Sequence, residues 1–560
     1  MSSKLTRREF LAASVTTTGA VLAACATPAA APETAPEAAD VPATTTEEME
    51  KTITLNQGWG TYNPIKPTLM GWGAESQLVP LLTHSRLMEF GNMQTKRLGI
   101  AERAEVSPDA SQYTYYMRQD VKFHDGTPLT ARDVEATAKL YLTKEANVNP
   151  IFWLDFIAGG KEFYEGATDE LSGVEVIDDY TIRFTLAEPF ARWDDTTICE
   201  MNILPAHIFE NVNPEDLKEE YSPAYFQPET HLGSGPFKFV AAERDQFVEL
   251  VRNDDYYLGQ PKLDRIMIRN FGESDTQFIA LEKGDLDVWN VPSPYLERVR
   301  ALPNVDVYEV NRLYHRMLRV NEQKPYLSDA RVRQALLYAI DRQALCEELE
   351  SGMCIPWDSF MQQSDWVPEG LNPYEYNPDK AMELLAQAEA DGVWDPNQEL
   401  TLEYYYDNPT HHDWFAAIQQ NLADVGVKSQ PLLLEGTGWV KRNVECEFDL
   451  AYEGFGTSHI TAYRGWFIKD DGCRAMWNTD EADELFLKVQ TSPDEEVQRQ
   501  YMTELQLLVN DQLPVIPFVK YVGAIAVNKR ITGFDENAIW LMQSIFNTGW
   551  NNSHNWDVTS

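Results

Sequence analysis

The stretch from 113 to 142 constrains the fold most, because a strand pattern changes to a helix pattern within it. YTYYMRQDVKF at 113–123 has the aromatic and β-branched character of a strand. Asp125 and Gly126 then favour a tight turn, and Thr130 with Asp133 forms a capping box that opens the helix TARDVEATAKLYL. Strand and helix share one local unit, which indicates an α/β fold.

The same mixture continues along the chain, without an internal repeat. Further strands are expected at 180–188, 237–251 and 265–271. We expect one amphipathic helix over 328–350, a second from Asn377 and Pro378 to Gly392, and a third opened by Ser492 and ending near Asn510. Because strands and helices do not alternate strictly, the sequence predicts α/β lobes that contain mixed sheets.

The first residues are expected to form an export signal. Arg7 and Arg8 precede a run of apolar, small and hydroxyl residues, 10–24, which is too short to span about 30 Å of hydrocarbon. The arginine pair resembles a twin-arginine signal, and residues 22–25 resemble a lipobox in which Cys25 is lipidated. The alternative is an ordinary signal peptide in which Cys25 is incidental. We assign residues 1–25 to a lipoprotein signal.

Residues 26–49 are expected to form a disordered tether, because 26–46 contain only Ala, Pro, Glu, Thr, Val and Asp. About 510 of the 560 residues then remain, too many for one core, which predicts two or three domains. These residues contain no second long uncharged apolar run. We therefore expect an exported folded body, lipid-anchored at the outer face of the cytoplasmic membrane.

The formal net charge of −42 limits the partners of the chain. It argues against nucleic acid, whose phosphates would be repelled, and it disfavours strongly anionic solutes. An odd number of cysteines remains after Cys25, namely Cys199, Cys346, Cys354, Cys446 and Cys473. Cys346 with Cys354 and Cys446 with Cys473 are close in sequence, so two bridges and one thiol form one arrangement. Five buried, reduced thiols form the other.

Polar clusters that could suggest catalysis or metal binding have local structural explanations. His124 and Asp125 lie at the turn before a capped helix. The run 411–413, His-His-Asp, suits a polar turn into a helix, because adjacent residues rarely face one ion together. Acidic pairs that could suggest a glycosidase arise by chance among 88 acidic residues, and no G-x-S-x-G elbow is present. We predict no enzyme, no metal and no cofactor.

The stretch VSPDASQYTYYMRQDVKFHDGTPLTARDV at 106–134 resembles the signature of the family 5 extracellular solute-binding proteins of ABC transporters. Segments in the family's order and spacing follow: GSGPFKFV at 233–240, ALEKGDLDVW at 280–289, VNEQKPYLSDARVRQALLYAIDRQAL at 320–345, LADVGVKSQ at 422–430 and FDLAYEGFG at 448–456. The resemblance covers essentially the whole chain after the tether. It implies a receptor for peptides, nickel or oligosaccharides.

The resemblance also implies a monomer with a two-lobed, periplasmic-binding-protein-like fold of type II and an extra subdomain. Lobe I would comprise 50–84, 196–300 and 516–560, with the subdomain at 85–195, and lobe II would comprise 301–515. Two chain crossings would form a hinge that closes on a solute contacting both lobes. The tether would keep this receptor near the membrane permease to which it delivers the solute.

In peptide-binding relatives an aspartate in a segment like GWxxDY pairs with the amino terminus of the peptide. Aligning Gly454 and Phe455 with that Gly-Trp places Ser458 where the carboxylate would be. This departure weighs against a peptide, because a buried ammonium without an anion has a large desolvation cost. Glu453 would substitute in a different register.

Aromatic residues are the expected ligand contacts, because flat rings suit the apolar faces of sugars. Core packing is the alternative for each ring, since the chain has 15 Trp. We expect an oligosaccharide ahead of an oligopeptide, with a nickel chelate or another small solute as further alternatives. The predicted ligand-binding residues are Trp59, Tyr62, Trp289, Trp439, Phe455, Ser458 and Trp466.

Two rival functions fit the same sequence. One is a secreted glycoside-active enzyme, which turnover of an oligosaccharide would reveal. The other is a receptor that signals to a membrane sensor. Neighbouring permease and ATPase genes would favour transport over this signalling role.

Overall fold

The computed structural model describes residues 50–56, 74–90, 96–146, 156–218, 227–456, 460–463, 479–533 and 548–559. All of them belong to one unit, 50–560, whereas residues 1–49 form a separate unit that lies outside the described residues. The predicted signal, the tether and Cys25 fall in that separate unit. No helix in the described part of the chain has the length and apolar character needed to cross a bilayer.

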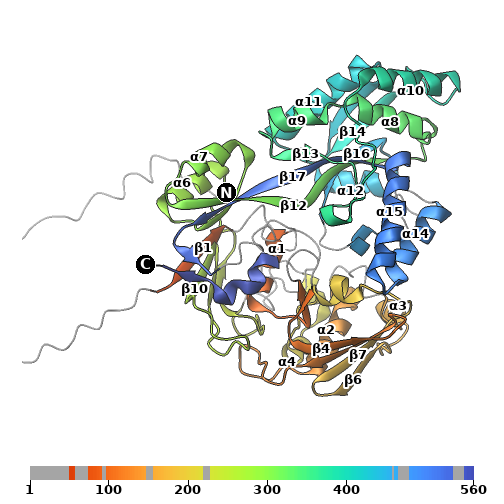
Figure 1. The fold of residues 1–560 in the computed structure, drawn as a ribbon. Coiled ribbons are helices and arrows are strands. Elements are labelled where there is room, and N and C mark those ends of the chain that lie inside the picture. Colours follow the sequence, from red (N-terminus) through yellow and green to blue (C-terminus); the bar gives the residue numbers. More distant parts are fainter. Residues whose placement is uncertain are drawn as a thin grey trace, which may run out of the picture. The chain divides into compact units, whose positions relative to one another are not determined.

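One large mixed sheet runs through the described residues (Figure 1). Its strand order is β15-β14-β16-β12-β17-β11-β1-β10-β9-β8, and β13 pairs with β17 beside this path. The strands are β1 (Thr52–Asn56), β8 (Phe237–Glu243), β9 (Phe247–Arg252), β10 (Arg265–Arg269), β11 (Val288–Val291), β12 (Val305–Val320), β13 (Cys354–Pro356), β14 (Glu399–Tyr404), β15 (Lys428–Leu433), β16 (Leu450–Phe455) and β17 (Val515–Asn528).

The long antiparallel strands β12 and β17 join the two halves of this sheet. The first part of β12 pairs with the end of β17, which also pairs with β11. From His315 onward β12 lies between β17 and β16. The register of the β12–β17 pair shifts between Asn311 and His315. The two halves of the sheet form the centres of the two lobes of an α/β fold, and both strands pass from one lobe to the other.

Lobe I is built on β11, β1, β10, β9 and β8. Ile53 and Leu55 of β1 alternate with less buried neighbours and join Ile266 and Ile268 of β10 in one hydrophobic core. β1 runs parallel to both β10 and β11, whereas β8, β9 and β10 are antiparallel neighbours. The accompanying helices are α1 (Ala74–Thr83), α6 (Ser274–Lys283) and α7 (Leu296–Arg300).

Helices cover both faces of the lobe II half. Successive strand residues point to opposite faces, so Leu318 and Ile516 pack in one core while their neighbours Met317 and Val515 pack in another. The first core includes residues of α8 (Ala330–Ala339), α9 (Arg342–Leu349), α10 (Pro378–Ala390) and α11 (Pro409–Asp424). The second includes residues of α14 (Asp480–Thr491) and α15 (Glu495–Gln512). A further helix, α12 (Gly436–Val444), follows β15.

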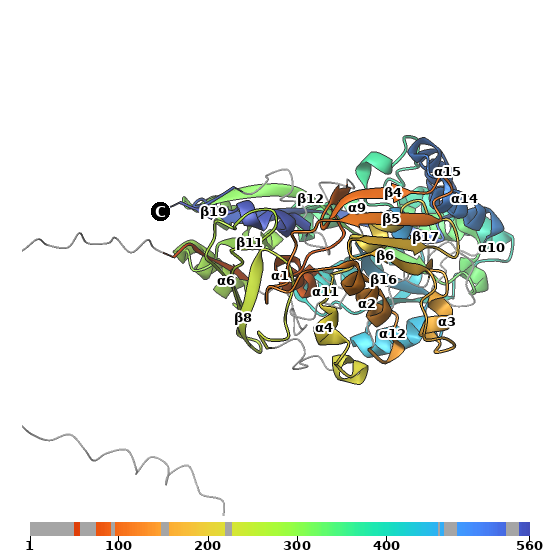
Figure 2. The same cartoon turned by 90° about the horizontal axis from the view of Figure 1, so that it is seen from below.

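A smaller antiparallel sheet, β4-β5-β7-β6, accompanies lobe I, and Figure 2 shows it with α2 nearby. Its strands are β4 (Ala101–Val106), β5 (Gln112–Met117), β6 (Val174–Asp178) and β7 (Thr181–Thr185). The remaining elements are α2 (Ala131–Tyr141), α3 (Gly160–Tyr164), α4 (Ala206–Phe209), β2 (Met88–Phe90), β3 (Lys96–Leu98), β18 (Ile531–Thr532) and β19 (Asp557–Val558). The core of this sheet is continuous with that of lobe I.

Local helix signals are confirmed where a side chain caps the backbone. Asp133 Oδ2 accepts the Thr130 backbone N–H at 2.8 Å, as the capping box predicts. The Asn377 side chain accepts from the Lys380 N–H at 3.0 Å and opens α10 with Pro378 in its first turn. Gly392 follows the end of α10 with φ of +74°.

Three predicted elements are wrong in detail. The segment 328–350 forms two helices, because Ile340 is extended and the Asp341 side chain accepts from Ala344 N–H to open α9. The segment 237–251 forms the hairpin β8–β9, reversed at Asp245 with φ of +58°. The last long helix, α15, is capped by Asp494, which accepts from Glu496 N–H, and not by Ser492. In the first two cases a turn or a capping side chain interrupts an otherwise continuous pattern, and in the third the capping residue lies two positions later than predicted.

Candidate functional site

The carboxyl ends of three parallel strands meet at one edge of lobe II. β14 runs parallel to both β15 and β16, so the chain leaves the sheet on the same side after Tyr404, Leu433 and Phe455. β12 enters lobe II beside this edge, because His315 lies opposite Phe455 on β16. Ligands of open α/β sheets bind outside the carboxyl ends of strands. This edge, next to the strands that join the lobes, is the candidate site.

A cluster of hydroxyls and one guanidinium occupies this edge, and we call it the tyrosine–arginine cluster: Tyr314, Arg316, Tyr405, Tyr406 and His411. The hydroxyls of Tyr405 and Tyr406 lie 2.8 Å apart, and those of Tyr314 and Tyr406 lie 3.3 Å apart. Arg316 Nη1 donates to the Tyr314 hydroxyl at 2.5 Å. Tyr314, Tyr405 and Tyr406 are each partly exposed, so the cluster reaches the surface of the protein at this edge.

Arg316 is the buried centre of the cluster, with 7% of its surface exposed. Its guanidinium lies 3.9 Å from the centroid of the Tyr406 ring, a cation–π distance. Gly454 lies opposite on β16, and a side chain there would overlap Tyr314 and Arg316. The Gly454 N–H donates to the Tyr406 hydroxyl at 3.0 Å. A glycine at this position therefore allows the strand to approach the guanidinium.

His411 completes the cluster from the first turn of α11. Asn408 caps this helix by accepting from the His411 N–H at 3.1 Å, as expected for a polar turn into a helix. Burial, and then the Arg316 charge, lowers the pKa of His411 to about 3, so the ring is neutral. Nδ1 lies 2.9 Å from Asn408 Oδ1 and therefore carries the proton, which leaves Nε2 to accept from Arg316 Nη2 at 3.5 Å.

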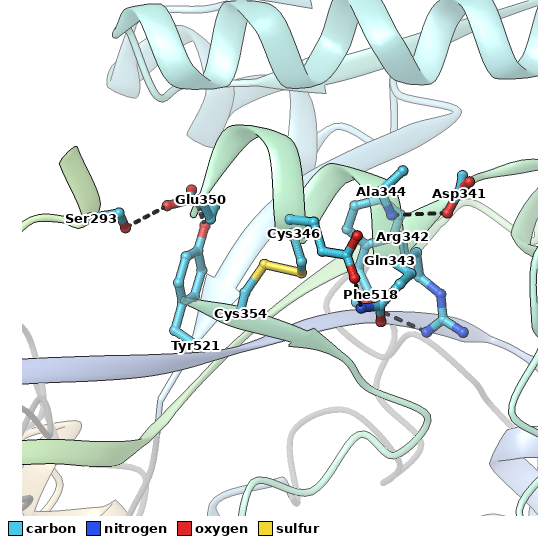
Figure 3. Close-up of a disulfide and its surroundings, with 11 residues drawn as sticks. Ser293, Asp341, Arg342, Gln343, Ala344, Cys346, Glu350, Cys354, Phe518 and Tyr521 are labelled. Atoms are coloured by element: carbon cyan, nitrogen blue, oxygen red, sulfur yellow. Dashed lines mark hydrogen bonds between the residues drawn. A yellow bond between two sulfur atoms is a disulfide. The ribbon is translucent and has the colours of Figure 1, made fainter. Parts of the chain in front are cut away.

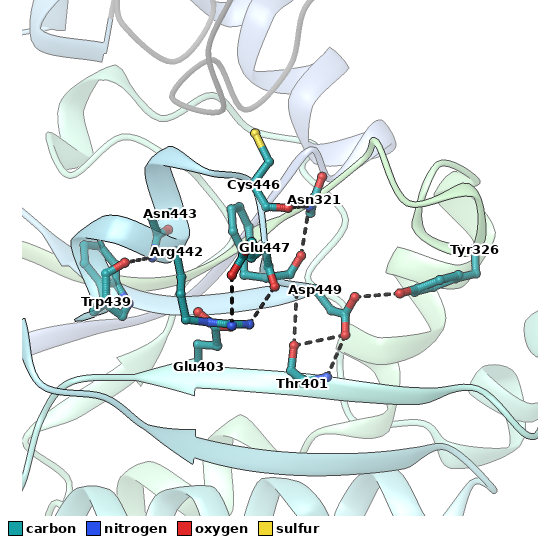
Figure 4. Close-up of polar contacts among 11 residues, drawn as sticks. Asn321, Tyr326, Thr401, Glu403, Trp439, Arg442, Asn443, Cys446, Glu447 and Asp449 are labelled. Atoms are coloured by element: carbon teal, nitrogen blue, oxygen red, sulfur yellow. Dashed lines mark hydrogen bonds and ion pairs between the residues drawn. The ribbon is translucent and has the colours of Figure 1, made fainter. Parts of the chain in front are cut away.

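Ionic contacts behind this edge hold α12 and the strands in place (Figure 4). Arg442 donates to Glu403 Oε1 from Nη2 at 2.7 Å and from Nε at 2.8 Å. Burial raises the pKa of Glu403, and the Arg442 charge opposes this shift. Asp449 accepts from the Tyr326 hydroxyl at 2.6 Å and from Thr401 N–H at 2.8 Å. These side chains have partners inside lobe II, so they position the site and do not face a ligand.

Glu350 joins the lobes beside the crossing strands (Figure 3). Its carboxylate accepts from the Ser293 hydroxyl at 3.1 Å and from the Tyr521 hydroxyl at 3.3 Å. Ser293 follows β11 of lobe I, whereas Glu350 follows α9 of lobe II. The Cys346–Cys354 disulfide links α9 to β13, which pairs Cys354 with Tyr521 of β17. The bridge therefore fixes the segment that carries Glu350.

The cysteines are partly oxidised, so the all-reduced arrangement is wrong. Cys346 and Cys354 form one bridge, with their Cα atoms 5.2 Å apart. Cys446 is also in a disulfide, and its predicted partner Cys473 lies outside the described residues. Cys199 is a buried thiol within the lobe I core.

The predicted ligand residues separate into three groups. Trp439 and Phe455 lie at the candidate edge, where the Trp439 ring packs 4.9 Å from Tyr405 in a T-shaped contact. Trp289 is 2% exposed and packs in a lobe I core, with its indole N–H donating to Gln277. This burial favours a packing role for Trp289. The others lie outside the described residues: Trp59, Tyr62, Ser458 and Trp466.

Sequence reasoning missed the tyrosine–arginine cluster. The run EYYYD at 403–407, directly after a strand, was the available signal for Tyr405 and Tyr406. Glu453, the alternative partner for a peptide ammonium, lies on the opposite face of the sheet from Arg316, 3.5 Å from Arg319. Burial raises the pKa of Glu453, opposed by the Arg319 charge. Its pairing with Arg319 makes it a poor anion for an ammonium.

The stretch around His124 is structural, as expected. His124 Nε2 lies 3.1 Å from the Gly235 carbonyl oxygen, and Asp133 Oδ1 accepts from the Ala206 N–H at 3.0 Å. Among the described residues, no group of His, Cys, Asp or Glu has a geometry that could hold a metal ion.

Two lobes joined by two long strands, with aromatic rings at the carboxyl edge of one lobe, define the class of two-lobed solute-binding proteins. The sequence profile of the bacterial extracellular solute-binding proteins, family 5 (Middle), matches residues 97–468, more than half of the chain. The chain therefore belongs to this family, whose members bind solutes and are not enzymes.

Curated relatives agree with this assignment. A putative ABC transporter peptide-binding protein of Brucella abortus is 28% identical over 376 residues, 66% of each chain, so the match spans just under two thirds of that relative. Heme-binding protein A of Haemophilus influenzae is 26% identical over 476 residues, 83% of this chain and 85% of that protein. The oligopeptide-binding protein AppA of Bacillus subtilis, solved with a nonapeptide, has a TM-score of 0.72 at 22% identity and covers 91% of this chain and all of its own.

Proposed function

We propose that the chain is the solute receptor of an ABC importer, which captures an oligosaccharide or an oligopeptide between its lobes and delivers it to a membrane permease. Family membership and the names of the relatives support transport, and the relatives' names favour the peptide. The observation that carries the proposal is the aromatic edge of lobe II, because it lies where the strands β12 and β17 leave for lobe I.

The edge suits an organic solute with both apolar and polar parts. Tyr405, Tyr406 and Trp439 present partly exposed rings, and the Tyr405 and Tyr406 hydroxyls add hydrogen-bonding groups. Rings of this kind stack on sugar faces and on apolar peptide side chains alike. A solute bound here would favour closure, because lobe I could then contact its other side.

The domain boundaries and the anchor belong to the same proposal. Lobe I would comprise 50–84, 196–300 and 516–560, the subdomain 85–195 and lobe II 301–515. The twin-arginine signal would export the chain, and a lipid on Cys25 would hold the monomeric receptor near its permease through the tether 26–49.

Binding is tested by thermal shift and calorimetry with oligosaccharides and oligopeptides. A true ligand at 100 times its dissociation constant stabilises the protein by roughly 2.7 kcal/mol. Trp439→Ala should weaken binding, whereas Tyr376→Ala, which removes an exposed aromatic elsewhere in lobe II, should not. Conversion of a bound oligosaccharide into products would refute a receptor, and so would the absence of saturable binding by either class.

Transport and anchoring are tested in cells. Deleting the gene for this protein should abolish cellular uptake of the ligand that binds in vitro. If uptake stays normal and a transcriptional response to the ligand is lost, the protein is instead a signalling receptor. Cys25→Ser should prevent incorporation of labelled palmitate and release the protein from membranes. A Cys199→Ser variant is the control, since that buried thiol should leave anchoring unchanged.

A further inference from the structure

The buried arginines of lobe II differ in their ionic partners. Arg319, Arg333 and Arg342 are each more than nine-tenths buried, and each lies within 4 Å of a carboxylate. Those distances are 3.5 Å to Glu453, 3.0 Å to Glu322 and 2.9 Å to Asp358. Arg316 is buried to a similar extent, but no described carboxylate lies within ion-pair distance of it. It is the exception that requires an explanation.

The groups around Arg316 leave part of its hydrogen-bonding capacity unused. Nη1 donates to the Tyr314 hydroxyl and Nη2 to the neutral His411 ring, but Nε has no partner. A guanidinium carries five N–H donors in a planar fork that matches a carboxylate. These two bonds and a side-chain hydrogen bond with Tyr521 still leave part of the fork without an acceptor, and none of the three partners is a carboxylate.

The neighbouring groups are also rich in donors. The Gly454 N–H and the hydroxyls of Tyr314, Tyr405 and Tyr406 contribute protons, and none of these groups is an anion. Glu350 lies beyond Tyr521, whose ring centroid is 5.6 Å from the Arg316 guanidinium. Its two oxygens accept from Ser293 and Tyr521, so its charge serves the contact between the lobes.

We propose that Arg316 is the subsite for a single carboxylate on the solute, which reaches the guanidinium over the rings of Tyr314 and Tyr406. A buried charge without a partner is costly, and a ligand carboxylate that forms a bidentate pair recovers that cost on binding. The inference rests on the proposed function and narrows its solute class. Neutral oligosaccharides are disfavoured, because they would leave the guanidinium unpaired.

Two kinds of solute could supply this carboxylate. An oligopeptide carries it at its carboxyl terminus, and an acidic oligosaccharide carries it on a uronic acid residue. The overall charge of −42 disfavours a strongly anionic solute, so one carboxylate fits better than several. The chemistry at Arg316 is the same for both sources. The ligand panel must therefore contain both.

The first test compares each acid with its neutral partner on the full mature chain. Tetrapeptides are paired with their C-terminal amides, and a uronate disaccharide is paired with its methyl ester. Whichever ligand class binds, the wild-type protein should bind its acid roughly 10- to 100-fold more tightly than the matching amide or ester, as expected for a charge-assisted pair. Arg316→Met should reduce that ratio to about one, and Arg316→Lys should retain part of it.

Arg319→Met is the matched control for this ratio. Arg319 lies on the same strand, is equally buried, and points to the opposite face of the sheet, where Glu453 is its partner. This variant should lose stability but keep the acid-to-neutral ratio. A general loss of folding stability weakens binding of the acid and of its neutral partner equally, so it does not change their ratio. An unchanged ratio in Arg316→Met, or loss of the ratio in Arg319→Met, would overturn the assignment.

The two proposals fail in different ways. If amides, esters or neutral sugars bind as tightly as acids, the receptor stands and the Arg316 subsite is refuted. If no member of either class binds, the proposed function itself is refuted. If only peptides or only uronates show the preference, the subsite is supported and its source is identified.

The second test needs no ligand. If Arg316 has no internal anion, replacing it with Met removes an unpaired buried charge, and the ligand-free protein should melt within about 2 °C of wild type or higher. If a carboxylate of the chain pairs with Arg316, the same change should lower the melting temperature by about 5 °C or more. That drop would contradict the inference.

Discussion

Two buried polar clusters, one in each lobe, differ in how their groups are partnered. In lobe I the Thr83 hydroxyl donates to the Val79 carbonyl at 2.9 Å, so it accepts from the two rings near it, His84 Nδ1 at 2.9 Å and His231 Nε2 at 3.0 Å. In lobe II the Arg316 guanidinium meets phenols and a neutral ring, with no described carboxylate. The first cluster joins neutral groups of the chain to one another, whereas the second holds a buried charge that has no carboxylate partner among the described residues.

The glycines beside the two clusters show the same difference. A Cβ on Gly233 would overlap the carbonyl of Thr83, which is backbone and cannot move independently of α1. A Cβ on Gly454 would overlap the ends of the Tyr314 and Arg316 side chains, which can rotate away. Close contact in lobe I therefore fixes the architecture, whereas close contact in lobe II fixes only side-chain positions. We therefore expect mutations in the lobe I cluster to affect mainly folding, and mutations in the lobe II cluster to affect mainly ligand binding.

The largest effect is expected from Gly233→Ala. The new methyl group has no space beside the Thr83 backbone, so we expect the free energy of unfolding to fall by about 4 kcal/mol or more. Urea denaturation of the purified protein measures this. Gly438→Ala is the control, because its Cβ meets nothing within 4 Å inside α12 and should raise stability by about 0.5–1 kcal/mol. Equal stabilities for the two variants would contradict a tight backbone contact in lobe I.

Acid should destabilise the protein through its buried histidines. Burial, and then the charges of Lys520 and Arg316, lowers the pKa of His315 to about 3, and burial lowers that of His84 as well. The unfolded chain therefore binds more protons below about pH 6.5, so stability falls as the pH decreases towards 3. At pH 4.5 we expect a loss of about 2–3 kcal/mol from His315 alone.

The variant His315→Leu separates this effect from other titrations. His315 is fully buried, and neither ring nitrogen has a partner among the described residues, so leucine removes no hydrogen bond. Urea midpoints at pH 7.5 and 4.5 should differ less in this variant than in wild type. His84→Leu, by contrast, should lower stability at both pH values, because it removes a partner of Thr83. An unchanged pH dependence in His315→Leu would rule out His315 as a source of acid lability.

Local sequence signals predicted local structure well. Thr130 and Asp133, and Asn377 with Pro378, cap their helices through contacts within four residues, which a linear pattern contains. The break at Ile340 was missed because apolar periodicity continues across it, and only Asp341 marks the new helix. The β8–β9 reversal was missed because a non-glycine residue adopts positive φ there.

The site could be predicted only in part, because its residues come from separate segments. Trp439 and Phe455 were predicted as ligand contacts because they are aromatic residues of second-lobe segments, and both lie at the candidate edge. Arg316 was not, since its contact with Tyr406 depends on β12 and β14 pairing with opposite sides of β16. Trp289 and Trp439 are both tryptophans, and only the burial of Trp289 in the folded protein distinguishes it as a packing residue.

Gly454→Ala should affect binding more than folding. Its methyl group displaces flexible side-chain ends, so we expect a loss of only about 1–2 kcal/mol in unfolding free energy. The displaced guanidinium should weaken binding of a carboxylate ligand by roughly tenfold. Calorimetry and urea denaturation on the same preparation measure both. A stability loss as large as that of Gly233→Ala would remove the distinction between the two clusters.

The smallest effect is expected from removing one hydroxyl at the rim. Tyr405→Phe loses only the partly exposed contact with Tyr406, so we expect about 0.5 kcal/mol in unfolding free energy. Tyr406→Phe should cost about 1–2 kcal/mol, because it also leaves the Gly454 N–H without its acceptor. Urea midpoints of the two variants give the comparison. Equal losses would mean that the Gly454 contact contributes nothing, and that the lobe II cluster is held by ring packing alone.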